Sequence, residues 1–487
     1  MLTRRDFIRT AALFALAPRI LAEPERKIWV NDVHSQLNPT RVRELLTPRT
    51  RDELVQIVRS ASQKSLPISV SGCRHSMGGQ QFAKDSICID TRSLDRVISF
   101  DRERGLIEAE AGIQWPKLIR TYLDAQAGSA KQWGIAQKQT GADTFTLGGS
   151  LASNVHGRGL AMKPLISNVE SFSLINAEGK SMRCSRDENN ELFRLAIGGY
   201  GLFGLIDSVT LRLVPRQKLR RVVEIIRVSD LPRRFEERIE ETFLYGDFQF
   251  SVDEKSPDFL ERGVFSCYQH IDEDEPTVAK RQLRDDDWLE LLRLAYTDRE
   301  KAFKRYSDYY LSTNGQTYWS DTNQLSPYLP DYAQQIRTQI GGDESSLIIT
   351  EIYVPRAELP DFLTQAAELL RSKRTIVIYG TVRLTERDSE SFLAWARKPY
   401  ACIIFNLLTF HTPTGIDASG RAFRGLIDLA IARGGSYYLT YHKFAKPEQV
   451  MACYPQFKEF LELKRKYDRA ECFQSDWYRY YRKLFTG

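Results

Sequence analysis

The sequence of 487 residues is poor in the features that mark several large protein classes. Outside the extreme N-terminus it has no apolar run close to the roughly 18 residues that a membrane span requires. Its 29 glycines and 19 prolines follow no period, which excludes collagen-like and low-complexity chains. Apolar residues make up 42% and charged residues 27% of the chain, as in ordinary globular proteins, so the composition also excludes a disordered chain.

A strong excess of one charge is missing as well. The chain carries 69 basic and 63 acidic side chains, and the net charge of +6 is too small to indicate a nucleic-acid partner. Seven cysteines, odd in number and scattered, lack the spacing of a disulfide framework or of metal ligands, so no metal site is expected. The acidic runs 272–275 and 285–287 are expected on solvated loops or helix faces.

The N-terminus has the order of a targeting segment. Arg4 and Arg5 precede Phe7 and Ile8, and a short apolar run over 11–17 follows. This order resembles a twin-arginine export signal, although an ordinary basic amphipathic start is the alternative. We expect residues 1–22 to be a signal segment that directs the protein through the twin-arginine (Tat) machinery, giving a periplasmic or exported protein.

Beyond the N-terminus the pattern changes character along the chain. Over residues 38–217 short strands alternate with helices such as those predicted at 51–63 and 115–125, which is typical of an α+β domain. Residues 218–445 predict a second domain of longer strands, including 347–354, 375–383, 401–408 and 436–441, covered by helices at 360–372 and 421–432. Residues 446–487 form a basic, aromatic C-terminal segment, which we expect to pack back on the first domain.

A glycine motif in the first domain resembles a dinucleotide-binding fingerprint but has the wrong surroundings. Gly199, Gly201 and Gly204 match G-x-G-x-x-G. The nicotinamide-binding fold needs a strand before these glycines and a helix after them, whereas here a helical pattern precedes and a strand pattern follows. A nicotinamide-binding domain is therefore excluded, although the glycines still indicate a close approach of backbone to another group.

Three glycine loops carry the chemistry that the sequence indicates. The first reads VSGCRHSMGGQ over 70–80, the second reads TLGGSLASNVHG over 146–157, and the third is the motif at 199–204. Backbone amides in such turns form concave sites for anions, which suits the phosphates of a nucleotide cofactor.

These loops resemble those of the vanillyl-alcohol oxidase and p-cresol methylhydroxylase (PCMH-type) flavoproteins, among them alditol oxidase, cytokinin dehydrogenase and decaprenylphosphoryl-ribose oxidase. The resemblance implies an α+β fold: an FAD-binding domain of two subdomains and a substrate-binding cap domain with an antiparallel sheet covered by helices. It also implies FAD as the cofactor. The residues that would contact FAD are Ser71, Gly72, Cys73, Arg74, His75, Ser76, Met77, Gly78, Gln80, Gly141, Thr146, Gly148, Gly149, Ser153, Asn154, His156, Ile206 and Tyr438.

The histidine of the first loop has a special role in relatives with this loop, because the matching side chain is bonded covalently to the flavin. The resemblance therefore implies covalent attachment through His75, with noncovalent binding as the alternative. No cysteine occurs over 141–146, so a second attachment is not expected. His156 matches a histidine near the flavin of the ribose oxidase, where it would contact the cofactor, orient the substrate or serve the fold alone.

Candidates for the catalytic groups lie in the predicted cap domain. Oxidation with FAD removes a hydride and a proton from the substrate, so the site needs a base and a positive charge near the flavin. Glu351, Arg383, Tyr441 and Lys443 are the candidates, and strand alternation would place Tyr441 and Lys443 on one face, with His442 on the other. The essential lysine of the ribose oxidase falls on Tyr441 here, which argues against that enzyme's lipid-linked substrate.

Polar candidates outnumber apolar ones, so the expected reaction is oxidation of a CH–OH group of a sugar, polyol or sugar lactone. The alternatives are an amine or phenolic alcohol as substrate, a nicotinamide-dependent reductase on the same fold, or an exported carbohydrate-binding protein without redox chemistry. The expected partners are a small-molecule substrate and an electron acceptor, which is oxygen, a quinone or a cytochrome.

Overall fold

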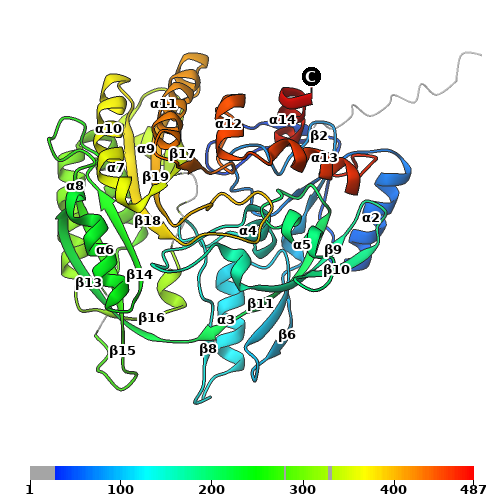
Figure 1. Ribbon diagram of the computed structural model, residues 1–487, viewed down its shortest axis with the longest axis horizontal. Helices are drawn as coiled ribbons and strands as arrows, with labels where there is room; N and C mark the ends of the chain where they lie inside the picture. The colour runs from blue at the N-terminus through cyan, green and yellow to red at the C-terminus, as the bar shows by residue number, and fades with distance from the viewer. Residues whose placement is uncertain (1–27, 279–280, 327–328, 330–331, 487) are drawn as a thin grey trace, which may run out of the picture.

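The computed structural model describes residues 28–278, 281–326, 329 and 332–486. The signal segment predicted at 1–22 lies outside these residues, so its structure stays untested. Within them, no helix combines the length and the apolar character that crossing a membrane would need. Figure 1 shows the N-terminal sheets on the right, a large sheet on the left, and the C-terminal helices across the top.

The N-terminal residues form a small parallel sheet. Its strands follow the order β3 (Glu44–Leu46), β5 (Ile87–Asp90), β4 (Ile68–Ser71), and a two-stranded ribbon of β1 (Ile28–Val30) and β2 (Thr40–Val42) lies beside it. Helix α2 (Arg51–Gln63) packs on this sheet, and it begins where Thr50 caps the Glu53 amide. The helix predicted at 51–63 is thus confirmed.

A five-stranded antiparallel sheet follows in the order β10-β9-β11-β7-β6. Its strands are β6 (Val97–Asp101), β7 (Leu106–Glu110), β9 (Val169–Ile175), β10 (Ser181–Ser185) and β11 (Leu205–Arg212). Helices α3 (Trp115–Ala125), α4 (Leu147–Ser153) and α5 (Asn190–Ala196) belong to the same part of the chain, and a short ribbon joins β8 (Trp133–Gly134) to β12 (Val214–Pro215). The helix predicted at 115–125 is confirmed, and so is the order of helix, glycine loop and strand around residues 199–204.

The second half of the chain builds an eight-stranded sheet in the order β16-β13-β15-β14-β18-β19-β17-β20. The strands are β13 (Lys218–Arg227), β14 (Phe243–Phe250), β15 (Arg262–Ile271), β16 (Thr317–Trp319), β17 (Ser345–Pro355), β18 (Val377–Thr385), β19 (Tyr400–Phe410) and β20 (Ser436–Tyr437). Each strand of this sheet pairs antiparallel with its neighbours, as the PCMH-type resemblance implied. The α+β fold class is confirmed.

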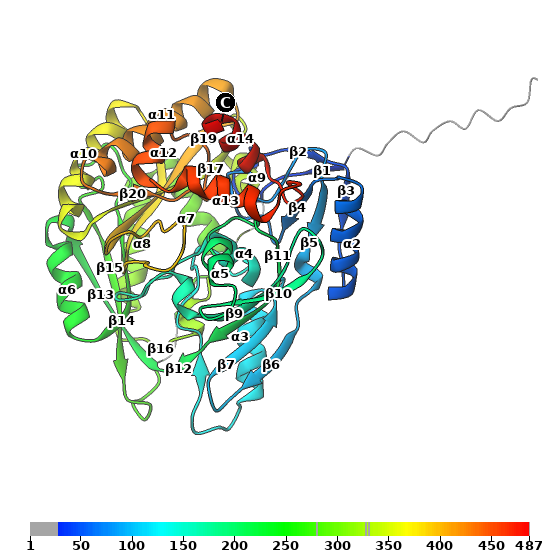
Figure 2. The same cartoon turned by 45° about the vertical axis from the view of Figure 1, so that its right-hand side comes forward.

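The two faces of this sheet differ because side chains alternate along each strand. One face carries Phe248, Phe265, Val382 and Ile403 and packs against α6 (Leu231–Glu240), α10 (Leu359–Ser372) and α11 (Pro413–Ile431). The opposite face is polar, and the helices α7 (Asp285–Thr297), α8 (Arg299–Ser312) and α9 (Tyr332–Ile340) cover its outer part. In Figure 2, α6 and α10 lie to the left of the large sheet, and the N-terminal sheets lie to its right.

The C-terminal helices α12 (Pro447–Cys453), α13 (Phe457–Tyr467) and α14 (Asp476–Thr486) return to the N-terminal sheets. Between α13 and α14 the chain runs beside β4, where Ile68 bonds the Cys472 carbonyl at 2.7 Å and Gln474 bonds the Ile68 carbonyl at 2.8 Å. The Trp477 ring lies 4.9 Å from that of Tyr200. Through these contacts the C-terminal segment touches strand β4 and Tyr200 of the first half of the chain.

One local expectation needs correction. The strand predicted over 436–441 ends at Tyr437, because the next residues turn away from the sheet edge into a loop. The acidic run 285–287 lies on a solvated helix, as expected: it forms the first turn of α7, where negative charge suits the helix N-terminus. The long strand β15 and the helices α7 and α8 were missed, since their apolar residues are interrupted by polar ones.

Candidate functional site

A cavity that is partly open to solvent lies between the N-terminal sheets and the polar face of the large sheet. All three glycine loops of the sequence line it. Three segments that are far apart in the sequence thus meet at one site.

The first loop leaves strand β4 and contacts the second loop directly. A Cβ atom on Gly72 would stand 2.2 Å from Thr146 Oγ1, so the two loops can meet only because this residue is glycine. Arg74 has a left-handed backbone with φ 62°, and Gln80 bonds the carbonyls of Leu439 and Thr440 at 3.0 and 2.9 Å. The loop is thus fixed against both the second loop and the chain that follows β20.

The second loop contains the short helix α4. Thr146 caps the Gly149 amide, and Gly148 lies so close to Ala111 that an added Cβ would approach the Ala111 Cβ to 2.8 Å. The helix ends at Asn154, whose left-handed conformation turns the chain toward His156. The Asn154 amide bonds Asp388 at 2.9 Å, so this turn is anchored in the cap domain.

The third loop closes the same cavity. Gly201 has φ +72° with open space where a Cβ would lie, and Gly204 has φ +145°, a conformation that only glycine adopts readily. The Tyr200 ring lies next to them on the cavity wall, together with Ile206. The close approach of backbone that the sequence indicated is therefore directed into this cavity.

His75 is held at one end of the cavity by two partners. Its Nδ1 lies 2.8 Å from His34 Nε2, and its Nε2 lies 2.8 Å from Thr144 Oγ1. Burial and the neighbouring His34 keep the pKa of His75 well below its usual 6.5, against the opposing effect of Thr144. Burial likewise lowers the pKa of His34 to about 4, although Asp32 opposes it. Both imidazoles are neutral at physiological pH, so His75 retains a nucleophilic lone pair.

The cavity residues fit FAD. Arg74 Nε and Gln81 Oε1 are buried in its wall, and neither atom has a hydrogen-bond partner among the residues described. Such orphaned polar atoms point to a missing polar ligand. Arg74 is a cation in this wall, paired with Asp90 at 3.4 Å, and the glycines allow the backbone to come close to an anionic group.

A buried ionisable pair lies beside the His156 end of the second loop. His156 Nε2 makes a short hydrogen bond to Glu351 Oε1, and the Tyr353 hydroxyl donates to the same oxygen at 3.1 Å. Burial by itself would raise the pKa of Glu351, but His156, Arg383 and Tyr353 outweigh it and hold that pKa below its usual 4.5. The carboxylate is therefore ionised at neutral pH.

His156 is held by two partners. Its Nδ1 lies 3.1 Å from the Gly157 carbonyl, and its Nε2 is bonded to Glu351 Oε1. Both side chains are buried, so removal of either one would leave the other without this hydrogen bond.

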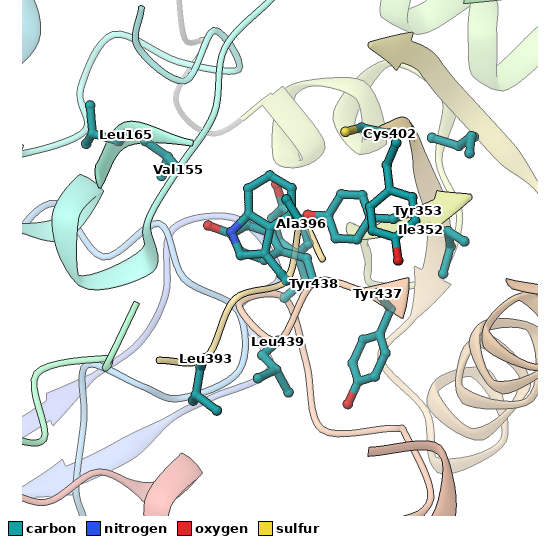
Figure 3. Close-up of a cluster of buried hydrophobic side chains, with 14 of the residues drawn as sticks. Val155, Leu165, Ile352, Tyr353, Leu393, Ala396, Cys402, Tyr437, Tyr438 and Leu439 are labelled. Carbon is teal, nitrogen blue, oxygen red and sulfur yellow. The ribbon is translucent and has the colours of Figure 1, made fainter. Parts of the chain in front are cut away.

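Tyr441 connects this pair to the cavity. Its side chain lines the cavity, and burial together with the charge of Glu351 raises the pKa of its hydroxyl well above 10. Arg383 is buried on β18, with no hydrogen-bond partner for Nε and Nη1 in the described part of the chain. Figure 3 shows Tyr353 and Cys402 of the cap strands beside Tyr438 of the loop after β20.

His156, Glu351 and Cys402 present ligand atoms within 4.8 Å of one another, although the sequence indicated no metal site. The atoms of His156 and Glu351 that face each other are already joined by a hydrogen bond. A metal ion would have to replace that bond.

The structure places most of the expected cofactor residues on the cavity wall. Those that line it are Gly72, Cys73, Arg74, His75, Ser76, Gln80, Gly141, Thr146, Gly148, Gly149, Ser153, Ile206 and Tyr438. Outside that set are Ser71, Met77, Gly78, Asn154 and His156. Asn154 supports the turn of the second loop, and His156 is engaged by Glu351 instead.

Lys443 is not brought to Glu351 and Tyr441. Its Nζ lies over the Tyr480 ring at 5.8 Å and near Gly79, on the side of the C-terminal helices. The reason is the early end of β20: beyond Tyr437 the chain is a loop, so strand alternation no longer decides where side chains point. His442 points into an apolar site beside Phe423, at 3.8 Å between ring centroids.

Several cavity residues escaped sequence reasoning. His34, Gln139 and Ile349 line the cavity from three distant segments and belong to no motif. Tyr200 lies within the third glycine loop but was not proposed as a site residue. Lys138 was missed too: it is fully buried, bonded to Asp143 at 2.9 Å, and burial lowers its pKa to about 8 against the opposing effect of Asp143. A charged residue in a glycine-containing stretch gave no sign of burial.

Comparison with known proteins points to the same cofactor. Residues 43–185 match the FAD binding domain family. The chain is 31% identical over 169 residues to L-gulonolactone oxidase of Scyliorhinus torazame, covering 34% of this chain and 36% of that protein. It is 27% identical over 239 residues to cytokinin dehydrogenase 3 of Arabidopsis thaliana, covering 47% and 44%. It is 27% identical over 205 residues to mitochondrial L-galactono-1,4-lactone dehydrogenase of Arabidopsis thaliana, covering 41% and 32%.

The glycine loops, the cavity and the antiparallel cap sheet together define an α+β flavin-binding protein. Residues 43–185 are an FAD-binding domain of the type shared by vanillyl-alcohol oxidase and p-cresol methylhydroxylase, which confirms the resemblance and FAD as the cofactor. In each of these alignments the chain spans less than half of the relative's length.

Proposed function

We propose that the protein is an FAD-linked oxidoreductase that oxidises a CH–OH group of a sugar lactone, sugar or polyol to a carbonyl. The observation that carries the proposal is the buried, hydrogen-bonded Glu351–His156 pair behind Tyr441, at the wall of a cavity whose residues fit FAD. L-Gulonolactone oxidase and L-galactono-1,4-lactone dehydrogenase are among the relatives, which supports a lactone substrate.

The chain's own residues would divide the work as follows. FAD held by the three glycine loops would supply the acceptor for the hydride that leaves the substrate carbon. Tyr441 touches the substrate from the cavity wall, and Glu351 takes the proton that the hydroxyl loses. His156 and Tyr353 hold the carboxylate in place, and Arg383 supplies positive charge from β18.

We further propose that His75 attaches the flavin covalently and that the protein is exported with its cofactor bound. The neutral imidazole at the cavity wall supports the attachment, and the twin-arginine pattern of the first residues supports the export. The expected electron acceptor is oxygen, a quinone or a cytochrome.

An amine substrate is the second candidate, because cytokinin dehydrogenases match the chain as well as the lactone enzymes do. The two are separated by mixing the flavin-loaded protein, without oxygen, with L-gulono-1,4-lactone, L-galactono-1,4-lactone, sorbitol or a cytokinin. Bleaching of the flavin absorbance by a lactone or polyol supports the proposal, and bleaching by the cytokinin alone contradicts it. Admitting air afterwards and measuring peroxide identifies oxygen as the acceptor.

A further inference from the structure

One row of side chains on the polar face of the large sheet stays accessible between buried neighbours. Ile349 on β17 is paired with Asn406 on β19, and Asn406 is paired with Tyr379 on β18. Tyr379 is 36% exposed, and Ile349 and Asn406 are half-buried. We call these three residues the open row.

The rows on either side of the open row are covered. On one side Leu347, Leu408 and Ile378 pack with Ala295 of α7 and Ala302 of α8. On the other side Glu351, Ile404 and Thr381 are 1%, 6% and 0% exposed. The β-bulge at Val377/Tyr379 turns both Ile378 and Tyr379 toward the polar face. Two consecutive side chains of β18 therefore lie on this face between the helices and the site. The open row is thus the uncovered strip between the helical cover and the ionisable pair.

The open row is continuous with the FAD cavity. Ile349 is itself part of the cavity wall. Glu351 lies two residues farther along β17 on the same face, which is about 7 Å of strand. From Ile349 to Tyr379 the row crosses two strand spacings, about 10 Å. A ligand lying on the row can therefore reach into the cavity at Ile349 while its body rests on Asn406 and Tyr379.

The side chains of the row offer a defined chemistry. Tyr379 presents an aromatic ring, which packs against an apolar ring face. Asn406 Nδ2 donates a long hydrogen bond of 3.4 Å to the Tyr379 carbonyl, and no described residue bonds Asn406 Oδ1. This oxygen can therefore accept a hydrogen bond from a hydroxyl group of a ligand. An apolar ring face edged with hydroxyl groups is the surface of a sugar or a sugar lactone.

We propose that the open row is the substrate platform of the protein, with Tyr379 stacking on the carbon face of a hydroxylated ring and Asn406 bonding one of its hydroxyls. This inference rests on the proposed function and names the two residues that select the substrate. Loss of either contact weakens binding and leaves the proton acceptor intact.

The test measures binding apart from turnover. The flavin of the protein is first reduced photochemically under nitrogen, so that no reaction follows, and L-galactono-1,4-lactone is titrated by calorimetry. We expect Tyr379→Ala and Asn406→Leu each to raise the dissociation constant about tenfold, the loss of one aromatic or hydrogen-bonding contact. Tyr379→Phe should bind as the wild type does. Phe410→Ala is the matched control, because Phe410 is an equally exposed aromatic residue on β19.

A second measurement examines hydroxyl recognition. γ-Butyrolactone has the ring without hydroxyl groups, so Asn406→Leu should leave its affinity unchanged and abolish the preference for the hydroxylated lactone. In the oxidised protein the limiting rate of flavin reduction should change less than about twofold in these variants, since they affect binding alone.

The outcomes separate this inference from the proposed function. If lactones bleach the flavin and both variants bind them with wild-type affinity, the platform is wrong and the proposed function stands. If lactone binding depends on Tyr379 and Asn406 but never leads to reduction, the platform stands and the proposed function fails. If the wild type binds no lactone and binds a cytokinin, the assignment to a hydroxylated ring is overturned.

Discussion

Replacing Glu351 with glutamine tests the central step of the proposed chemistry. The substitution keeps the size of the side chain and removes its ability to accept a proton. A positioned general base contributes about 10²- to 10⁴-fold to the rate, which is roughly 3 to 5 kcal/mol of activation free energy. Because three residues, His156, Tyr353 and Arg383, act on this carboxylate, we expect the rate to fall by a factor near the upper end of this range.

The assay is the anaerobic rate of flavin reduction by the substrate, followed over a range of pH. Since the pKa of Glu351 is held below 4.5, the wild-type rate should be constant above that pH and fall only below it. Glu351→Gln should abolish this acidic limb together with most of the rate. Glu368→Gln, at an exposed position of α10, is the control and should leave both unchanged.

His156→Gln examines the positioning of the carboxylate. Without the His156 ring, a cause that lowers the pKa of Glu351 is lost and burial raises that pKa, so the acidic limb should move to higher pH. A variant Glu351→Gln that contains flavin, folds normally and is reduced at the wild-type rate would refute the reasoning. An unmoved acidic limb in His156→Gln would show that the pair does not control the proton acceptor.

Three further predictions concern the flavin and the stability of the fold. His75→Ala should release all flavin from acid-precipitated protein, whereas His270→Ala, at an exposed histidine, should retain it in the pellet; flavin retained by both contradicts attachment through His75. His442 is buried without a hydrogen-bond partner among the described residues, and burial lowers its pKa to about 3. Between pH 6.5 and 3 the unfolded chain therefore binds a proton that the native protein does not bind. The free energy of unfolding should fall as the pH drops through this range. His442→Phe should remove this acid loss in urea denaturation, and parallel pH profiles of the two proteins would contradict it. Asp468→Ala should lower the free energy of unfolding by about 3 to 5 kcal/mol, since it leaves the buried Lys464 ammonium unpaired and frees two backbone amides.

The local elements were predictable because their signals are local. The apolar spacing and Thr50 cap of α2, the strand alternation of β17 and the glycines of the three loops are all short-range patterns. The same holds for the rejection of a nicotinamide site, which needed only the order of helix, loop and strand around residues 199–204.

The contact between Glu351 and His156 could not be predicted from the sequence. Glu351 and His156 were proposed separately, yet the bond between them joins residues 195 positions apart. Lys443 was placed with them by strand alternation, which fails once the chain leaves β20 after Tyr437. His34 and Lys138 had no sequence signal, because burial and partners are properties of the assembled molecule.

By itself the sequence determined the FAD-binding loops and the α+β class, since glycine conformation and side-chain periodicity act within a few residues. Only the tertiary structure decided which charges meet and which surface stays open. The packing of α7 and α8 covers one row of the large sheet, His156 of the second loop contacts Glu351 in another, and the row of Ile349, Asn406 and Tyr379 is left between them. Which row stays uncovered depends on contacts between segments that are distant in the sequence, and no local sequence pattern predicts such contacts.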